Sequence, residues 1–200
     1  PAKESLLEMY QVERDWKKAI IAATELEGLQ GKSHQIEIAQ FHCELAQEAL
    51  RRKDLVEAEQ SIQRALQAVP NHARALILQG DYLIAMDRPT QAIEVWSIVA
   101  NSHPAYMHLL ADRWMLAHAA INKEDEGLER LCELLKTQAS GELLDIVHKH
   151  LMKIRGPQAA NVMLSDVMQH SPTLIALSKM AETRLALEEG IASPERLLEL

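Results

Sequence analysis

The histidines are the side chains of this chain best suited to hold a metal ion, but their spacing does not favour a metal site. His148 and His150 lie two residues apart, on different sides of a helix, whereas helical metal ligands lie three or four residues apart. His103 and His108 flank a turn that contains a proline, where solvated or capping histidines are more common than zinc ligands. The sequence therefore predicts no metal site within these residues.

The acidic residues do not form a catalytic group with a nucleophile. Glu124, Asp125 and Glu126 follow one another, as acidic residues do at a helix N-terminus, where they meet the positive end of the helix dipole. Glu142 and Asp145 share a helix face, but no nucleophile or second acid is positioned beside them. The motifs GxGxxG, GxxxxGKS/T, GxSxG, HExxH and CxxC do not occur in the sequence. We therefore predict that this chain is not an enzyme.

Charge, cysteine usage and hydropathy narrow the class of partner. The formal net charge of −8 argues against nucleic acid or an anionic membrane surface as the main partner. Cys43 and Cys132 fall on apolar helix faces, so we expect two buried, reduced thiols in a reducing compartment. No apolar run approaches the roughly 18 residues that span a membrane. Because the chain opens at Pro1 inside a helical pattern, we expect a membrane anchor, if the protein has one, to precede this sequence.

Residues 39 to 104 contain a repeat of 34 residues. Five pairs of matching character have this spacing: Ala46 with Gly80, Ala58 with Ala92, Ile62 with Trp96, Ala65 with Val99 and Pro70 with Pro104. This order of small, large and proline residues is the pattern of the tetratricopeptide helix-turn-helix unit. The small residues let two helices cross closely, and the large residues fill the gap to the next unit. Each proline ends a unit because it lacks the N–H that a continuing helix needs.

The same frame divides the rest of the chain into helix pairs. We expect helices at 4–13, 15–28, about 34–52, 54–68, 72–86, 88–102, 124–137, 141–155, 157–170 and 173–189, and a short one after Pro194. The spacing from Ala19 to Ala58 is 39 rather than 34, which predicts an unusually long helix that begins near Ser33. We expect Asp15, Ser33 and Asp54 to be N-cap residues. Beyond Pro104 the pattern weakens, since Trp114 takes the place of Gly80 and Leu128, Leu131 and Leu135 lie one residue out of phase. Pro172 nevertheless lies twice 34 residues after Pro104.

These observations predict an all-α fold. Only 4% of the residues are aromatic, and the abundance of Ala, Leu, Glu and Gln favours helices over strands. The expected fold is a tetratricopeptide-repeat right-handed superhelical solenoid of antiparallel helix pairs. We predict a single array with units at about 1–31, 34–70, 73–104, 105–138, 141–172 and a partial unit at 173–200.

In such an array the first helices of successive units line a concave groove that binds proteins. The exposed first-helix positions are predicted to be Gln40, Glu44, Gln47, Arg51, Arg74, Ile77, Asp81, His108, Asp112, Met115 and His118, followed by Glu142, Asp145 and Lys149. This surface is mixed in charge and moderately apolar, which suits a peptide or a partner's helix. The alternative is that these residues form only a solvated face.

The first hundred residues carry a resemblance to a known family. The segment IEIAQFHCELA at 36–46, with SLLEMYQVERDWKKAI before it and KDLVEAEQSIQRAL after it, resembles the lipopolysaccharide assembly protein B family of Gram-negative bacteria. The resemblance extends from about Glu4 to Glu189 and includes the five-residue extension. It implies a non-enzymatic adaptor that regulates lipopolysaccharide biosynthesis at the cytoplasmic face of the inner membrane.

The resemblance also implies partners and flanking segments. Members of the family present the lipid A deacetylase to a membrane AAA protease, which limits lipopolysaccharide production, and they respond to an inner-membrane sensor protein. A transmembrane helix precedes the array in that family, and a rubredoxin-like ribbon that holds iron or zinc follows it, so we expect no cofactor in this part of the protein. Association of the chain into a homodimer stays open.

Two other functions are compatible with the sequence. The chain could be a tetratricopeptide scaffold for another envelope assembly, such as pilus or outer-membrane biogenesis. It could also be the repeat region of an enzyme whose catalytic domain lies elsewhere in the gene. CxxC pairs downstream of Leu200 would favour the lipopolysaccharide adaptor. A lipoprotein signal upstream would favour the scaffold of another envelope assembly.

Overall fold

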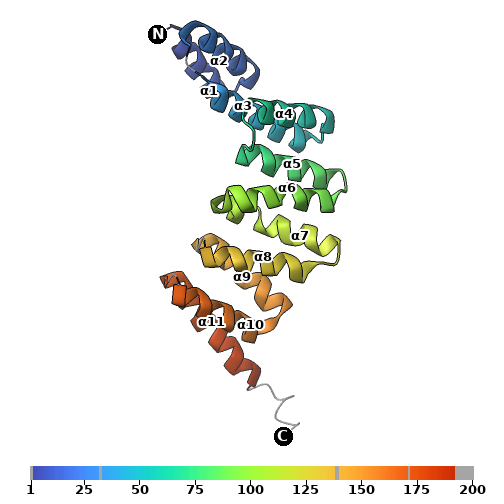
Figure 1. Ribbon diagram of the computed structural model, residues 1–200, viewed down its shortest axis with the longest axis vertical. Helices are drawn as coiled ribbons and strands as arrows, with labels where there is room; N and C mark the ends of the chain where they lie inside the picture. Colours follow the sequence, from blue (N-terminus) through green and yellow to red (C-terminus); the bar gives the residue numbers. More distant parts are fainter. Residues whose placement is uncertain (1, 32, 138–139, 171, 192–200) are drawn as a thin grey trace. The chain divides into compact units, whose positions relative to one another are not determined.

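The computed structural model describes residues 2–31, 33–137, 140–170 and 172–191, and every regular element within them is a helix (Figure 1). The helices are α1 Ala2–Glu13, α2 Trp16–Gln30, α3 Gln35–Arg52, α4 Leu55–Ala68, α5 Ala73–Ala85, α6 Pro89–Ser102, the 3₁₀ helix η1 Pro104–Leu109, α7 Ala111–Ala120, α8 Glu124–Thr137, α9 Gly141–Ile154, α10 Gly156–His170 and α11 Leu174–Ile191. The all-α class is therefore confirmed.

The chain divides into two compact units, Pro1–Asn101 and Ser102–Leu200. Unit 1 contains the pairs α1–α2, α3–α4 and α5–α6, and unit 2 contains α7–α8, α9–α10 and α11 (Figure 1). Within each unit, successive helices run back and forth and lie side by side. The arrangement of both units in a single array stays a prediction.

Each turn inside a helix pair contains one residue with a left-handed backbone. Arg14, Lys53, Asp87 and Asn122 have φ angles of 57°, 60°, 58° and 57°, and Gly156 has a φ of 82° in the last pair. The spacings between these residues are 39, 34, 35 and 34. The first spacing contains the five additional residues noted in the sequence. The third explains why the leucines after Pro104 lie one residue out of phase.

In the first four of these turns, the residue after the left-handed residue makes a backbone hydrogen bond to the end of the first helix. The N–H groups of Asp15, Asp54, Arg88 and Lys123 donate, over 2.8 to 2.9 Å, to the carbonyls five residues earlier, those of Tyr10, Ala49, Leu83 and His118. This Schellman bond satisfies a carbonyl that the helix end would leave unpaired. The Asp15 and Asp54 side chains also accept from the N–H groups of Lys18 and Glu57, which confirms both predicted caps.

The third helix pair shows why the repeat needs a small residue opposite a large one. Trp96 is fully buried, and its indole Nε1 donates to the Ile77 carbonyl over 3.1 Å. A Cβ added at Gly80 would lie 2.0 Å from that nitrogen, so only glycine leaves room for the ring. The predicted repeat positions Ala46, Ala58, Ile62, Ala65, Ala92 and Val99 are buried as well.

Prolines lie between successive helix pairs, as the repeat predicts. Pro70 is in the turn after α4, Pro104 begins η1, and Pro172 precedes α11. Pro89 is the first residue of α6, where its missing N–H costs no helical hydrogen bond.

The first helix of the fourth pair corrects one assignment. η1 precedes α7, and counting back from the left-handed Asn122 puts Met115, not Trp114, at the place of Gly80. Both side chains are buried. The Trp114 indole donates to the Gly127 carbonyl over 3.1 Å, so in this pair the tryptophan is on the first helix and bonds to the second, whereas Trp96 is on the second helix and bonds to the first.

The start of α3 also differs in detail from the prediction. The helix has 18 residues and is long, as expected. Its N-cap residue is His34, which makes no side-chain capping bond, whereas the predicted cap was Ser33. The Ser33 hydroxyl instead accepts from the Gln35 N–H over 3.4 Å. The short helix predicted after Pro194 lies outside the described residues.

Candidate functional site

In unit 1, α3 and α5 place four of the predicted groove residues in one polar network. The Arg74 guanidinium donates to Glu44 Oε1 over 2.6 Å and to Gln47 Oε1 over 2.7 Å. Gln40 Nε2 donates to the same Glu44 oxygen over 3.4 Å. The Arg74 and Glu44 side chains are 31% and 24% exposed, so the pair is held in place yet open to a partner.

Two further predicted residues lie on these helices. Arg51 is exposed in the last turn of α3, and its Nε donates to the Gln47 carbonyl over 3.4 Å. Asp81 is half-buried on α5, two turns beyond Arg74. Unit 1 therefore presents a first-helix surface of mixed charge.

Three predicted groove residues are buried, so their assignment to an exposed surface is wrong. Ile77 is one of four consecutive buried residues of α5, a helix covered on more than one side. Met115 is buried in α7. His118 Nδ1 donates to the Trp114 carbonyl over 2.9 Å, and its ring lies 4.6 Å from the Trp114 ring. A Cβ on Gly127 would come within 2.6 Å of that imidazole, so His118 is packed between α7 and α8.

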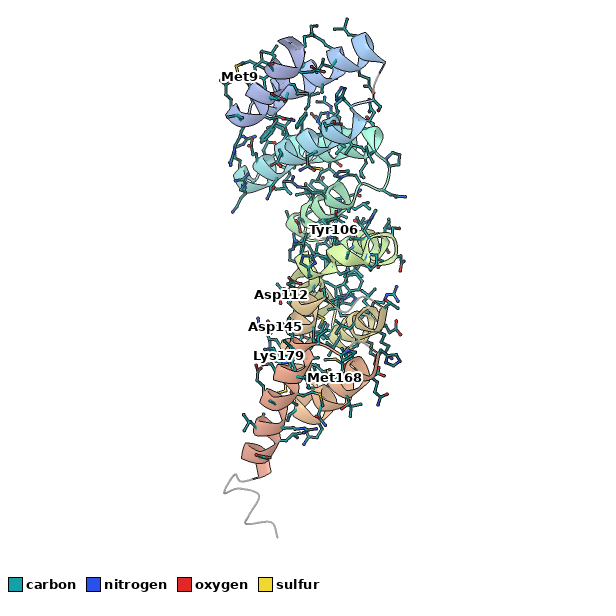
Figure 2. The ribbon with its side chains drawn as sticks, turned by 90° about the vertical axis from the view of Figure 1, so that its left-hand side faces the viewer. Met9, Tyr106, Asp112, Asp145, Met168 and Lys179 are labelled. Atoms are coloured by element: carbon teal, nitrogen blue, oxygen red, sulfur yellow. The ribbon has the colours of Figure 1, made fainter. Side chains whose placement is uncertain are left out.

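In unit 2, a row of charged side chains connects three first helices. His150 Nε2 on α9 donates to Asp112 Oδ1 on α7 over 2.8 Å. Lys179 on α11 pairs with Asp145 on α9 over 2.7 Å and with Glu182 over 3.0 Å. Figure 2 shows Asp112, Asp145 and Lys179 one after another along the same side of this unit. The hydrogen bond with Lys179 lowers the pKa of Asp145, and the same bond raises the pKa of Lys179.

His150, Lys179 and Glu182 were not among the predicted groove residues. A usable signal was present, because Asp145 and Lys179 have opposite charge and are 34 residues apart, which places them at one position of successive first helices. The other predicted residue of this unit, His108, lies in η1 and donates from Nδ1 to the Ala105 carbonyl over 2.8 Å. Glu142 and Lys149 are exposed on α9.

The neighbouring His148 and His150 have separate partners, as their spacing predicted. His148 Nε2 lies 2.8 Å from Thr183 Oγ1, and that hydroxyl donates to the Lys179 carbonyl over 2.7 Å. The hydroxyl hydrogen is therefore used, so the His148 Nε2–H is the donor to Thr183. Burial lowers the pKa of His148. In the part of the chain that the structure describes, no three His, Cys, Asp or Glu side chains gather to hold a metal ion.

Acidic residues of α8 serve helix packing. Glu124, Asp125 and Glu126 form its first turn, as predicted. Asp125 and Glu129 accept from the Arg155 guanidinium over 2.8 Å each, and these bonds raise the pKa of Arg155. This ion pair connects α8 to the end of α9.

The two cysteines differ in exposure. Cys43 is buried, and burial raises the pKa of its thiol to about 12. Cys132 is only partly buried, which corrects the expectation that both thiols are enclosed. Burial also raises the pKa of Cys132. Both are free thiols, and both are mostly protonated at pH 7, so neither is an activated nucleophile.

The chain is similar over most of its length to curated proteins named lipopolysaccharide assembly protein B. It is 29% identical to the protein of that name from Escherichia coli K12 over 196 residues, which cover 96% of this chain and 49% of the relative. It is 31% identical to the Haemophilus influenzae protein of that name over 105 residues, which cover 52% of this chain and 26% of the relative. The resemblance found in the sequence is therefore confirmed. The chain spans about half the length of the curated relatives it matches.

A solved structure of a Pseudomonas aeruginosa protein shares the fold of this chain. A structure from the functional characterisation of Pseudomonas aeruginosa PilF is 16% identical to this chain and has a TM-score of 0.53. The match covers 98% of this chain and 94% of that one. A thermophilic tetratricopeptide protein from Thermus thermophilus is 13% identical, with a TM-score of 0.48 over 94% of this chain and 98% of that one. The likeness to PilF shows the fold alone. No protein-family model matches the chain, and none of the described helices is long and apolar enough to cross a bilayer.

Proposed function

We propose that this chain is a non-enzymatic protein-binding scaffold that regulates lipopolysaccharide biosynthesis at the cytoplasmic face of the inner membrane. The observation that carries the proposal is the similarity to lipopolysaccharide assembly protein B over 96% of the chain. Paired helices of this type bind proteins through the surfaces of their first helices.

The network around Arg74 is the part of unit 1 best prepared for such binding. Glu44 and Gln47 hold the guanidinium in one orientation, so a partner does not have to order that long side chain. Arg51 adds an exposed cation beside this network. A partner segment with carboxylate or amide groups would meet donors and acceptors that are already positioned.

In the finer form of the proposal, the protein presents the lipid A deacetylase to a membrane AAA protease and receives a signal from an inner-membrane sensor. A membrane anchor before the array, and a ribbon that holds iron or zinc after it, would supply the location and a second binding element. The charged first-helix surfaces of the two units would each contact a part of a protein partner.

Co-purification of the full-length, membrane-anchored protein from its own cells tests the proposal. We expect the AAA protease and the deacetylase in the eluate, and a longer deacetylase half-life when the gene is depleted. Arg51→Glu should weaken deacetylase recovery without changing the thermal melt, because Arg51 is exposed. The matched control is Arg88→Glu, an exposed arginine in the α5–α6 turn.

Two outcomes would count against the proposal. Recovery of pilus or outer-membrane assembly factors in place of the protease and the deacetylase would keep the scaffold and reject the role in lipopolysaccharide control. Equal recovery of the deacetylase with Arg51→Glu and with the control would show that the deacetylase does not bind at this end of α3.

A further inference from the structure

A pocket of about 350 Å³ lies among α2, α3 and α4 of unit 1, away from the network around Arg74. Its lining includes residues from all three helices: Lys17 and Ile21 from α2, His42 and Leu45 from α3, and Ser61 and Arg64 from α4. The function proposed above uses none of these side chains.

One polar atom at this pocket has no partner. His42 is 7% exposed, and its Nδ1 is buried without a hydrogen bond to any described residue. Burial, with a smaller contribution from the Arg64 charge, lowers the pKa of His42 to about 4, so the ring is neutral at pH 7. A buried nitrogen without a partner costs about 1–3 kcal/mol.

The pocket also carries positive charge in a chain of net charge −8. Glu57 is shared by two cations, Lys17 at 3.1 Å and Arg52 at 2.6 Å. Arg64 is exposed and has no ion-pair partner in the described part of the chain. A carboxylate is the group that complements a guanidinium best, because the two can form parallel charge-assisted hydrogen bonds.

Apolar side chains lie beside these polar groups. Ile21 is 59% exposed at the pocket, and Leu45 on α3 is half-buried next to it. An aliphatic side chain of a ligand would bury these surfaces, at roughly 25 cal/mol for each Å² removed from water.

We propose that this pocket binds a segment of a partner protein in which an acidic side chain lies next to an aliphatic one. The acidic side chain pairs with Arg64, and the aliphatic side chain packs against Ile21 and Leu45. The inference rests on the proposed function in one respect, namely that the chain binds proteins. It adds a second binding surface, formed by the second helices α2 and α4 together with α3, and it names the kind of peptide sequence that this surface binds.

A peptide array tests the inference. The chain is incubated with 12-residue peptides that share an aliphatic core and differ only in whether the flanking residues are Glu, Gln or Lys. We expect preference for the Glu peptides, and on the order of tenfold weaker binding of these peptides to Arg64→Glu. Ile21→Ser should weaken binding to all three peptide classes. The matched control is Arg184→Glu, an exposed arginine on α11, and thermal melts verify that each variant is folded.

The results separate this inference from the proposed function. Equal binding of Glu, Gln and Lys peptides, or unchanged binding to Arg64→Glu, would overturn the pocket assignment even if the deacetylase and the protease co-purify with the full-length protein. Selective binding of Glu peptides through Arg64, without recovery of those two proteins, would keep the pocket and reject the role in lipopolysaccharide control.

Discussion

Gly80 and Trp96 form a steric pair in which each residue type requires the other. Because a Cβ at position 80 would meet the indole ring, Gly80→Ala is expected to destabilise the chain by about 1–3 kcal/mol. Trp96→Ala should cost about 3–5 kcal/mol, as truncation of a large buried side chain does. In the Trp96→Ala background the added methyl group meets no ring. Gly80→Ala should then be neutral, or stabilising by up to about 1 kcal/mol through its better helix propensity.

Urea melts of the two single variants and the double variant measure this coupling. Additive losses would show that the two side chains do not share one space. A loss below about 1 kcal/mol for Trp96→Ala would show that the register of the repeat is wrong.

His42 should make unit 1 sensitive to acid. Its pKa is about 4 in the folded chain and 6.5 in the unfolded chain, so the unfolded state takes up a proton first as the pH falls. Stability is therefore unaffected by this group above pH 6.5 and decreases between pH 6.5 and 4. The full loss corresponds to about 3 kcal/mol. Burial lowers the pKa of His118 and His148 too, which adds loss of the same sign.

The measurement is the free energy of unfolding at pH 7.5 and at pH 4. His42→Leu should reduce the difference between the two values, because the leucine cannot be protonated. Exposed His170→Leu is the control for replacing a histidine by leucine on the surface. The same pH dependence in His42→Leu and in the parent chain would contradict this assignment.

At the scale of the elements, the turns inside the helix pairs contain residues with a strained backbone, and replacing such a residue by glycine can stabilise the chain. Lys53 follows α3 with a φ of 60°, a conformation that costs a residue with a Cβ about 1–2 kcal/mol and costs glycine little. Lys53→Gly is expected to stabilise the chain by up to about 1 kcal/mol, because glycine also loses more chain entropy on folding. Gly156→Ala, at the equivalent turn, should destabilise it by about 1 kcal/mol.

Thermal or urea melts of both variants check the sign of each effect. Gln63→Gly, at an exposed position in the middle of α4, is a control for the general cost of glycine and should destabilise the chain. If Lys53→Gly were as destabilising as this control, Lys53 would not be left-handed in solution.

At the scale of the whole molecule, unit 1 contains its own apolar core. One cluster joins α1, α2 and α3 through residues such as Ala23, Leu26 and Phe41, and another joins α3, α4 and α5 through Ala46 and Ile62. Three repeats are about the minimum for a stable stack. Residues 1–101 alone are therefore expected to give a helical far-UV spectrum and a cooperative melt, whereas residues 1–52, which lack α4 and α5, should not. A non-cooperative melt of 1–101 would show that unit 1 needs unit 2.

Much of the fold can be predicted from the sequence because its determinants are local. The 34-residue period, the Asp15 and Asp54 caps and the prolines at unit boundaries depend on backbone hydrogen bonds within one turn. The single-residue offset after Pro104 was visible too, but its cause was not. Only the positions of η1 and of the turn at Asn122 show that Met115, and not Trp114, takes the repeat position of Gly80, because the sequence pattern is compatible with both alignments.

The candidate surface could be predicted only in part. The sequence by itself determined that first-helix residues such as Glu44, Arg74 and Asp112 lie on the exposed face of their helices and carry charge, because helical periodicity fixes which residues share a face. Only the tertiary structure decided that Ile77 and His118 are buried, that Lys179 pairs with Asp145, and that α2, α3 and α4 enclose a pocket. The reason is physical: burial and pairing depend on how closely separate helices pack, and the side chains of all the neighbouring helices set that distance together.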